Sequence, residues 1–420
     1  MTVACATAGA DPAAPQPAPV TPAASRLVET TLGWTTVLDA FVEVDAVPYS
    51  QHSLDEVVPI GTGGLRNEET VMIRHGFVRL EASRDRYFAE LELAGDTVAG
   101  PAARIQTSQV GWQVPAPEGD AALVRVRAGL MLIPFGTLVP TNARARYFME
   151  QPTFLRALFP GDVDAGANVD GAYGLVRYSI SAMNGAPIGD AQWAGRDPSS
   201  SYDLVSRLGT ELPLPDRGRF AAGISAVTGH GLHAGTPATK DSLQWVDENQ
   251  DGLIQVTELV DVPGSPAVPS QAFSRNALDL DATAHWCVRG LGHGELQFEG
   301  AIAKNLDRGI VYADPIARSR DVRELGFSLA LEQDLGPWAL AGVRYDRYDA
   351  DRDAVEQAGV ATVYTHEVFS TLSVMASARF HTARVSGQYD HVTNPFGRGD
   401  NGEPITQRAD KLTLRAQVEF

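Results

Sequence analysis

The sequence predicts an all-β protein, a transmembrane antiparallel β-barrel of about 16 strands. Three observations lead to this prediction. The last ten residues alternate strictly between apolar and polar side chains, no apolar stretch is long enough for a membrane-spanning helix, and similar alternating segments recur along the chain. Short and long connections separate these segments in turn, as the periplasmic turns and extracellular loops of outer-membrane barrels do.

The C-terminal segment, residues 411–420, is the clearest strand. Its apolar side chains all fall on one face: Leu412, Leu414, Ala416, Val418 and Phe420. Side chains of a strand point alternately to opposite faces, and this length crosses a bilayer obliquely. A closing strand that ends on an aromatic residue is typical of bacterial outer-membrane barrels. The final edge strand of a soluble β-sandwich would show the same alternation and is the alternative.

Composition excludes other architectures and partners. The longest uncharged apolar stretch, residues 128–140, has only 13 residues and contains Pro134, so it cannot form a transmembrane helix. Membrane insertion would therefore require a closed sheet, which leaves no unpaired backbone in lipid. The net charge of −18 argues against a nucleic-acid partner, which needs a basic surface.

The N-terminal 30 residues are predicted to lie outside the barrel. Ala8-Gly9-Ala10 has the pattern of a signal-peptidase site, and a tract rich in proline and alanine follows it. Residues 1–30 are thus interpreted as a remnant of an export signal and a disordered linker, and residues 31–420 as the barrel. Because Cys5 would be removed with the signal, we expect no structural disulfide with Cys287, the other cysteine.

Further strands follow from the same alternation of apolar and polar residues. In residues 278–288, for example, leucine, alanine and tryptophan alternate with aspartate, threonine and histidine, so the apolar face would contact lipid and the polar face the lumen. We expect strands at residues 37–45, 74–83, 87–94, 104–112, 123–132, 205–212, 220–228, 278–288, 295–304, 324–332, 339–346, 365–374, 379–391 and 411–420.

Several motifs resemble the porin O and P family of phosphate-selective porins. They are GFVRLE at residues 76–81, RAGLMLIPFG at 127–136, FMEQP at 148–152 and YSISAMNG at 178–185. The resemblance covers roughly residues 73–212. It implies a 16-stranded, usually trimeric barrel in the outer membrane of a Gram-negative cell, with a third outer loop that folds inward and narrows the pore. Residues 134–164 occupy that position, and the resemblance adds strands at residues 165–170 and 173–183.

The candidate pore-lining residues are mostly arginines. On the expected register four of them point inward from strands, and the others belong to the third loop: Arg125, Arg127, Arg177, Arg207, Arg144, Arg146, Glu150 and Arg156. The phosphate-binding members of the family use arginine ladders and lysines, but this chain has only Lys240, Lys304 and Lys411. Acidic side chains also face inward, and such mixed charge concentrates no single sign of ion strongly.

A second motif, residues 247–258, meets the EF-hand loop rule at every constrained position. Calcium is a hard cation that takes oxygen ligands. Side-chain oxygens would come from Asp247, Asn249 and Asp251, a carbonyl from Leu253, a bridging water through Gln255, and a bidentate carboxylate from Glu258. The flanks, with Pro237 and Pro263, are too short for the paired helices of a full EF-hand.

Weaker motifs support other functions poorly. His230 and His233 have metal-like spacing in a glycine-rich stretch, but no third ligand is near in the sequence. No nucleophile-elbow motif is present, so we expect no enzyme. The predicted function is a passive channel for small polar or anionic solutes, as a homotrimer in outer-membrane lipid with bound Ca²⁺. The alternative is a non-conducting, calcium-binding surface barrel with an adhesive or structural role, and conductance in planar bilayers would separate the two.

Overall fold

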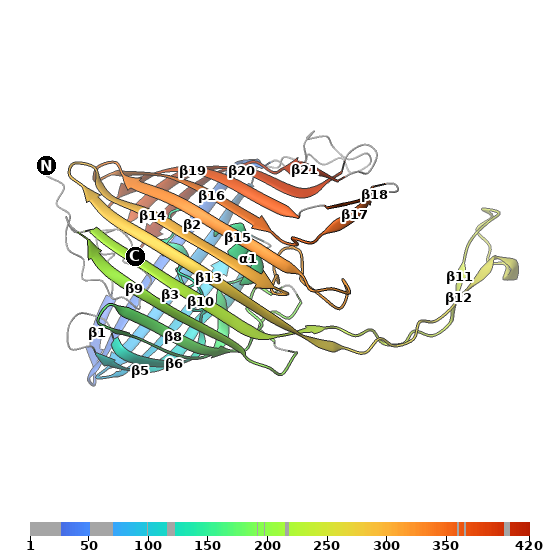
Figure 1. Cartoon of the computed structure of the whole chain (residues 1–420), viewed down its shortest axis with the longest axis horizontal. Helices are drawn as coiled ribbons and strands as arrows, with labels where there is room; N and C mark the ends of the chain where they lie inside the picture. The colour runs from blue at the N-terminus through green and yellow to red at the C-terminus, as the bar shows by residue number, and fades with distance from the viewer. Residues whose placement is uncertain are drawn as a thin grey trace.

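The computed structural model describes residues 27–50, 70–98, 100–115, 122–190, 192–196, 198–214, 218–358, 361–364, 367–398 and 404–420. The export signal and most of the linker predicted at residues 1–30 lie outside these ranges. In the described ranges, no helix has the length and apolar character needed to span a membrane. The chain folds into a closed antiparallel β-barrel of 16 strands (Figure 1).

Each barrel strand pairs with the next along the chain, and β2 pairs with β22 to close the ring. The barrel strands are β2 (Trp34–Ser50), β3 (Thr70–Arg84), β4 (Tyr87–Asp96), β5 (Ala102–Pro115), β6 (Ala122–Leu132), β7 (Val163–Tyr173), β8 (Val176–Met183), β9 (Asp203–Leu214), β10 (Gly218–His233), β13 (Gln271–Val288), β14 (Gly292–Lys304), β15 (Arg323–Asp334), β16 (Ala339–Asp349), β19 (Val368–Phe380), β20 (Ala383–Arg398) and β22 (Lys411–Glu419). Two short strands extend this sheet: β1 (Leu27–Thr31) pairs with β2, and β21 (Pro404–Arg408) pairs with β20.

The alternation of each strand places polar residues inside the barrel and apolar residues outside. On β13, Leu278 and Leu280 are 45% and 57% exposed on the outer surface, whereas Asp279 and Asp281 are each 1% exposed. A soluble β-sandwich buries its apolar faces between two sheets, so this arrangement excludes the sandwich alternative. Charges inside and an apolar band outside are what a bilayer requires of a spanning barrel.

All 16 predicted strand segments correspond to barrel strands, with two misplaced turns. The predicted strands 365–374 and 379–391 place a turn at residues 375–378. In the structure β19 continues to Phe380 and β20 begins at Ala383. The alternation runs past residue 374 without interruption, and the turn occurs at His381, whose φ is 54°. Tyr173, expected to begin a strand, instead ends β7, because Gly174 at φ 57° makes the turn.

Short turns join the strands at one end of the barrel and longer connections join them at the other. The third long connection, residues 133–162, is called loop 3 and contains η1 (Ala143–Ala145) and α1 (Thr153–Leu158). Loops 5, 6 and 7 are residues 234–270, 305–322 and 350–367. Loop 5 is an extended arm between β10 and β13 that carries the hairpin of β11 (Ser242–Trp245) and β12 (Leu259–Val262) far from the barrel (Figure 1). Loop 7 carries a second hairpin, β17 (Val355–Ala358) with β18 (Ala361–Tyr364).

An apolar cluster fills the barrel interior toward its long-loop end. Loop 3 contributes the largest share, and its Phe135, Phe154 and Leu155 have no exposed surface. Leu306 of loop 6 and Tyr348 of β16, both fully buried, complete the cluster against the wall. The interior core therefore ties two loops to each other and to the strands.

Cys287, near the short-turn end of β13, is disulfide-bonded, so the prediction that no disulfide forms is wrong. The chain has one other cysteine, Cys5, which lies outside the described residues. The prediction relied on distance along the sequence and on removal of Cys5 with a signal.

Candidate channel constriction

Loop 3 folds into the barrel, as predicted, and crosses its interior between β6 and β7. Five of the six residues of α1 are buried. Phe154 packs closely against the wall, because a Cβ added to Gly326 of β15 would lie 2.2 Å from the Phe154 side chain. The short helix lies within the ring of strands in Figure 1. Loop 3 therefore reduces the cross-section available to a solute.

Polar side chains of β10 and β14 hold the first part of loop 3. The Glu299 carboxylate oxygen Oε2 accepts hydrogen bonds from the backbone N–H groups of Thr137 and Leu138, each at 2.9 Å. The Thr137 hydroxyl donates to the same oxygen at 2.6 Å. The Ser225 hydroxyl accepts a bond from Gly136 N at 3.0 Å. These wall residues satisfy loop backbone groups that have no secondary-structure partner.

The second part of loop 3 is held from other strands of the barrel. Gln388 on β20 accepts a hydrogen bond from Met149 N at 2.9 Å, and Asp346 on β16 accepts one from Thr153 N at 3.3 Å. Arg344 donates to the Glu150 carbonyl at 2.6 Å, and its guanidinium lies 4.8 Å from the centre of the Phe148 ring. The loop is thus fixed along its length by side chains from well-separated strands.

The predicted residues of loop 3 form ion pairs, with one exception. Glu150 pairs with Arg74 of β3 at 2.7 Å, Arg146 pairs with Asp162 at 2.6 Å, and the Arg144 guanidinium lies 3.5 Å from Asp39 of β2. Arg156, on α1, is solvent-exposed, and the described residues contain no acid in ion-pair contact with it. Arg156 is therefore the loop cation most available to a solute.

The four predicted arginines of the wall all lie on inward faces, and each has an acidic neighbour. Arg125 and Arg127 of β6 share Asp170 of β7, at 2.9 and 3.0 Å. Arg177 of β8 lies 3.5 Å from Glu211 of β9. Arg207 of β9 forms a bidentate pair with Asp281 of β13. The positive charge of this wall is therefore largely compensated, as the mixed signs in the sequence indicate.

Two interior arginines, Arg79 and Arg308, are not among the predicted pore-lining residues. Arg79 of β3 pairs with Asp39 at 2.8 Å, and its inward position follows from the alternation of β3. Arg308 of loop 6 is 5% exposed and donates to the carbonyls of Gly185 and Leu158. No sequence signal marks Arg308, because loop 6 has neither a motif nor a periodicity.

The predicted calcium loop is bounded by strands and not by helices. β11 and β12 pair from Ser242–Val262 to Trp245–Leu259, so a two-stranded ribbon brings the ends of residues 247–258 together. Asp247 accepts hydrogen bonds from Asp251 N and Gly252 N, and Asn249 accepts one from Asp251 N. These bonds close a tight turn in the first half of the loop, with Gly252 at φ 72°.

The remaining predicted ligands lie in the second half of that loop. The Gln255 amide donates to Asp251 at 2.8 Å, and Leu253 is largely exposed. Glu258 is 4% exposed and accepts a hydrogen bond from the Trp245 indole at 3.0 Å. Within the described residues, no three or more histidine, cysteine, aspartate or glutamate side chains converge as metal ligands do. Asp247, Asn249 and Asp251 thus accept hydrogen bonds within the turn, while Glu258 accepts one from Trp245.

The two histidines considered as zinc ligands lie on β10, and not on a loop as their glycine-rich surroundings suggested. His230 is exposed, and His233 contacts Asp314 of loop 6 at 2.6 Å. Partial burial disfavours the charged form of Asp314, but the hydrogen bond from His233, the backbone N–H groups of Ala317 and Ile316 and the charge of His233 together lower the pKa of the carboxyl group. The His233–Asp314 pair therefore joins loop 6 to the wall.

Comparison with known proteins places the fold among outer-membrane barrels. No family model and no curated protein matches the sequence. The outer-membrane channel DcaP of Acinetobacter baumannii superposes with a TM-score of 0.54 at 10% identity, over 93% of this chain and 99% of its own. An anion-selective porin from Comamonas acidovorans superposes with a TM-score of 0.53 at 10% identity, over 92% of this chain and 100% of its own. OmpT of Vibrio cholerae superposes with a TM-score of 0.52 at 9% identity, over 94% of this chain and 100% of its own. At these identities the likeness shows a shared fold.

Proposed function

We propose that the protein is a passive diffusion channel of a Gram-negative outer membrane for small polar or anionic solutes. The observation that carries this proposal is loop 3, which lies inside the closed barrel and is held by wall side chains such as Glu299 and Arg344. A loop fixed in this way narrows an opening without the large motions of a lid. The outward apolar band and the similar folds of a channel and an anion-selective porin support it.

The lumen supports weak ion selectivity and not a strongly binding site. Paired charges such as Arg125 and Arg127 with Asp170 leave little net potential, so the lumen favours no single sign of ion strongly. Membership in the porin O and P family and assembly as a homotrimer remain parts of this proposal that rest on the sequence motifs. Phosphate selectivity is not part of it.

Conductance in planar bilayers tests the channel. The purified barrel is expected to give stable ohmic steps, and a variant lacking residues 147–160 is expected to give larger ones. The deletion is compatible with the fold because Arg146 and Asp162, which flank it, already form an ion pair at 2.6 Å. Heat-modifiable migration on gels confirms that the variant is folded. Folded protein without conductance steps would instead support the non-conducting surface barrel.

We further propose that residues 247–258 bind Ca²⁺ outside the cell. The supporting observation is the tight turn in which side-chain oxygens of Asp247, Asn249 and Asp251 accept hydrogen bonds from neighbouring backbone N–H groups. Leu253 would add its carbonyl and Gln255 a bridging water, and Glu258 would complete the ligand set by leaving Trp245. The ribbon of β11 and β12 brings the loop ends together where an EF-hand uses helices.

Limited proteolysis tests the calcium proposal. Without its helix pair, the loop is expected to bind with a Kd on the order of 10⁻⁴ to 10⁻³ M. Calcium at millimolar levels then stabilises the arm by roughly 1 kcal/mol. Cleavage between residues 236 and 263 is therefore expected to increase on chelation in the wild type, and Glu258→Gln is expected to be cleaved readily in both conditions. Equal cleavage with and without calcium would defeat the proposal.

A further inference from the structure

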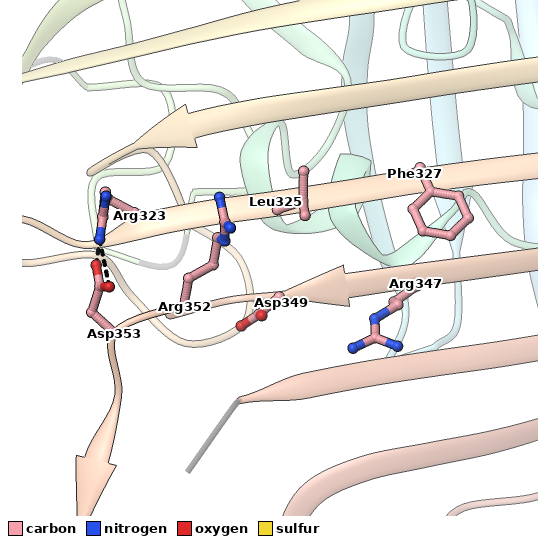
Figure 2. Close-up of a pocket in the computed structure, with 7 residues that line it drawn as sticks. All are labelled: Arg323, Leu325, Phe327, Arg347, Asp349, Arg352 and Asp353. Atoms are coloured by element: carbon pink, nitrogen blue, oxygen red, sulfur yellow. Dashed lines mark hydrogen bonds and ion pairs between the residues drawn. The ribbon is translucent and has the colours of Figure 1, made fainter. Parts of the chain in front are cut away.

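A pocket of about 220 Å³ opens on the outer surface of the barrel, away from the lumen. Figure 2 shows its lining, which comes from β15, the end of β16 and the start of loop 7: Arg323, Leu325, Phe327, Arg347, Asp349, Arg352 and Asp353. Leu325 is 36% exposed, whereas its neighbour Glu324 is 2% exposed and faces inward. The pocket is therefore on the face that would contact lipid.

The pocket lies at the long-loop end of the outward apolar band. β15 begins at Arg323 and β16 ends at Asp349, so both strands meet their long connections here. Toward the middle of the barrel the same outward face carries Leu329 and Tyr345, which are 46% and 39% exposed. If the long loops face the outside of the cell, this end of the apolar band lies at the level of the headgroups of the outer leaflet.

Two of the three arginines of the pocket form no ion pair with any residue that the structure describes. The guanidinium of Arg323 forms a bidentate pair with Asp353, with both distances 2.5 Å (Figure 2). Arg347 and Arg352 are exposed, and in the described part of the chain no acid lies within ion-pair distance of either guanidinium. An arginine on a lipid-facing strand is tolerated near the interface but is unfavourable without a partner deeper in the bilayer. These two exposed cations thus lie beside Leu325 and Phe327, while Asp349, the other carboxylate of the pocket besides Asp353, is only 8% exposed.

We propose that this pocket binds the phosphate group of an acylated, phosphorylated lipid of the outer leaflet. Guanidinium groups bind phosphate oxygens in bidentate geometry, and Arg347 and Arg352 supply two such groups. Leu325 and Phe327 supply an apolar surface that a free phosphate ion would not use but an acyl chain would. The proposal rests on the outer-membrane location proposed above, but not on conduction.

Binding to the full-length barrel in neutral detergent tests the site. The probes are bis-phosphorylated lipid A, the same lipid with its phosphates removed, and inorganic phosphate. The wild type is expected to bind the phosphorylated lipid at least tenfold more tightly than either of the others. The double variant Arg347→Gln/Arg352→Gln is expected to lose at least tenfold in affinity for it. A matched control, Arg86→Gln/Arg289→Gln, removes two exposed arginines at the short-turn end and is expected to bind as the wild type does.

Three results would overturn the assignment. Unchanged affinity in the double variant would exclude the two arginines, and equal binding of the dephosphorylated lipid would exclude phosphate recognition. Inorganic phosphate that binds as tightly as the lipid would make the pocket a free-anion site. Conductance of the same samples in phosphatidylcholine bilayers is measured separately. A barrel that binds the lipid but does not conduct therefore refutes the channel and not the lipid site, and the opposite result refutes only the lipid site.

Discussion

Thr137 of loop 3 and Glu299 of β14 are joined by two hydrogen bonds to one carboxylate oxygen, from the Thr137 backbone N–H at 2.9 Å and its hydroxyl at 2.6 Å. Glu299 is fully buried, and the backbone N–H of Leu138 donates to the same oxygen. One wall residue therefore sets where loop 3 enters the lumen.

Replacing Glu299 with alanine is expected to loosen loop 3. The change removes three hydrogen bonds to a carboxylate, each worth roughly 1.5–3 kcal/mol, and leaves two backbone N–H groups without their acceptor. Single-channel recordings should show a larger mean conductance with more current noise. Glu299→Gln keeps a carbonyl oxygen as acceptor and should lie between the alanine variant and the wild type. Identical recordings for all three proteins would show that Glu299 does not hold the loop.

Gly136→Ala is expected to destabilise the protein more than Gly174→Ala does. Both glycines have positive φ, 62° and 57°, so each substitution incurs a backbone strain of roughly 1–2 kcal/mol. A Cβ at Gly136 would lie 2.1 Å from Oε1 of Glu299, whereas nothing lies within 4 Å of a Cβ at Gly174. The additional cost of overpacking is about 1–3 kcal/mol. The temperature at which folded protein converts to the unfolded gel band measures the difference, and equal temperatures would contradict it.

Asp170→Asn is expected to increase preference for anions. Asp170 compensates both Arg125 and Arg127, so its neutralisation raises the net charge of this trio from +1 to +2. One unit charge about 4 Å from an ion in water contributes about 1 kcal/mol, which limits the change in permeability ratio to about fivefold. Reversal potentials in a salt gradient measure this ratio. Arg125→Gln should shift the potential in the opposite direction, and a shift of the same sign in both variants would argue against a role in selectivity.

Calcium is expected to change the fluorescence of Trp245. The indole donates a hydrogen bond to Glu258 at 3.0 Å, and calcium would withdraw that carboxylate as a ligand. Titration should give a saturable change with a midpoint on the order of 10⁻⁴ to 10⁻³ M. Trp245→Phe identifies the reporter among the six tryptophans. A titration that is the same in Asp247→Asn and the wild type would mean that the signal does not come from this loop.

The barrel was predictable because its determinants are local. Alternation places Leu278 outside and Asp279 inside whatever the rest of the chain does, and the ladder of neighbouring strands follows from short turns. The position of the turn at His381 was not predictable, because β19 continues its alternation through Ala378 and nothing in the pattern marks its end. The disulfide of Cys287 was likewise not predictable, because no local pattern marks it.

The site was predictable only in part. Inward arginines such as Arg125 and Arg207 follow from strand register, and the inward path of loop 3 followed from a resemblance and not from the residues themselves. The partners that hold loop 3, among them Gln388 and Glu299, lie more than 150 residues away in sequence. The ribbon around the calcium motif was missed because Ser242–Trp245 and Leu259–Val262 are each only four residues long, too short to show a period.

Hydrogen bonds to backbone groups join loops 3 and 6, in addition to the apolar core that the two loops share. Arg308 N donates to the Ala157 carbonyl at 2.9 Å, and the Arg308 side chain donates to that of Leu158. Tyr348 of β16 donates in turn to Asp307 at 2.7 Å. Neither loop can leave the lumen without breaking the bonds of the other, so the amides of both should exchange with solvent in one cooperative subglobal opening. Widening of this passage is therefore an all-or-none event that involves both loops and β16.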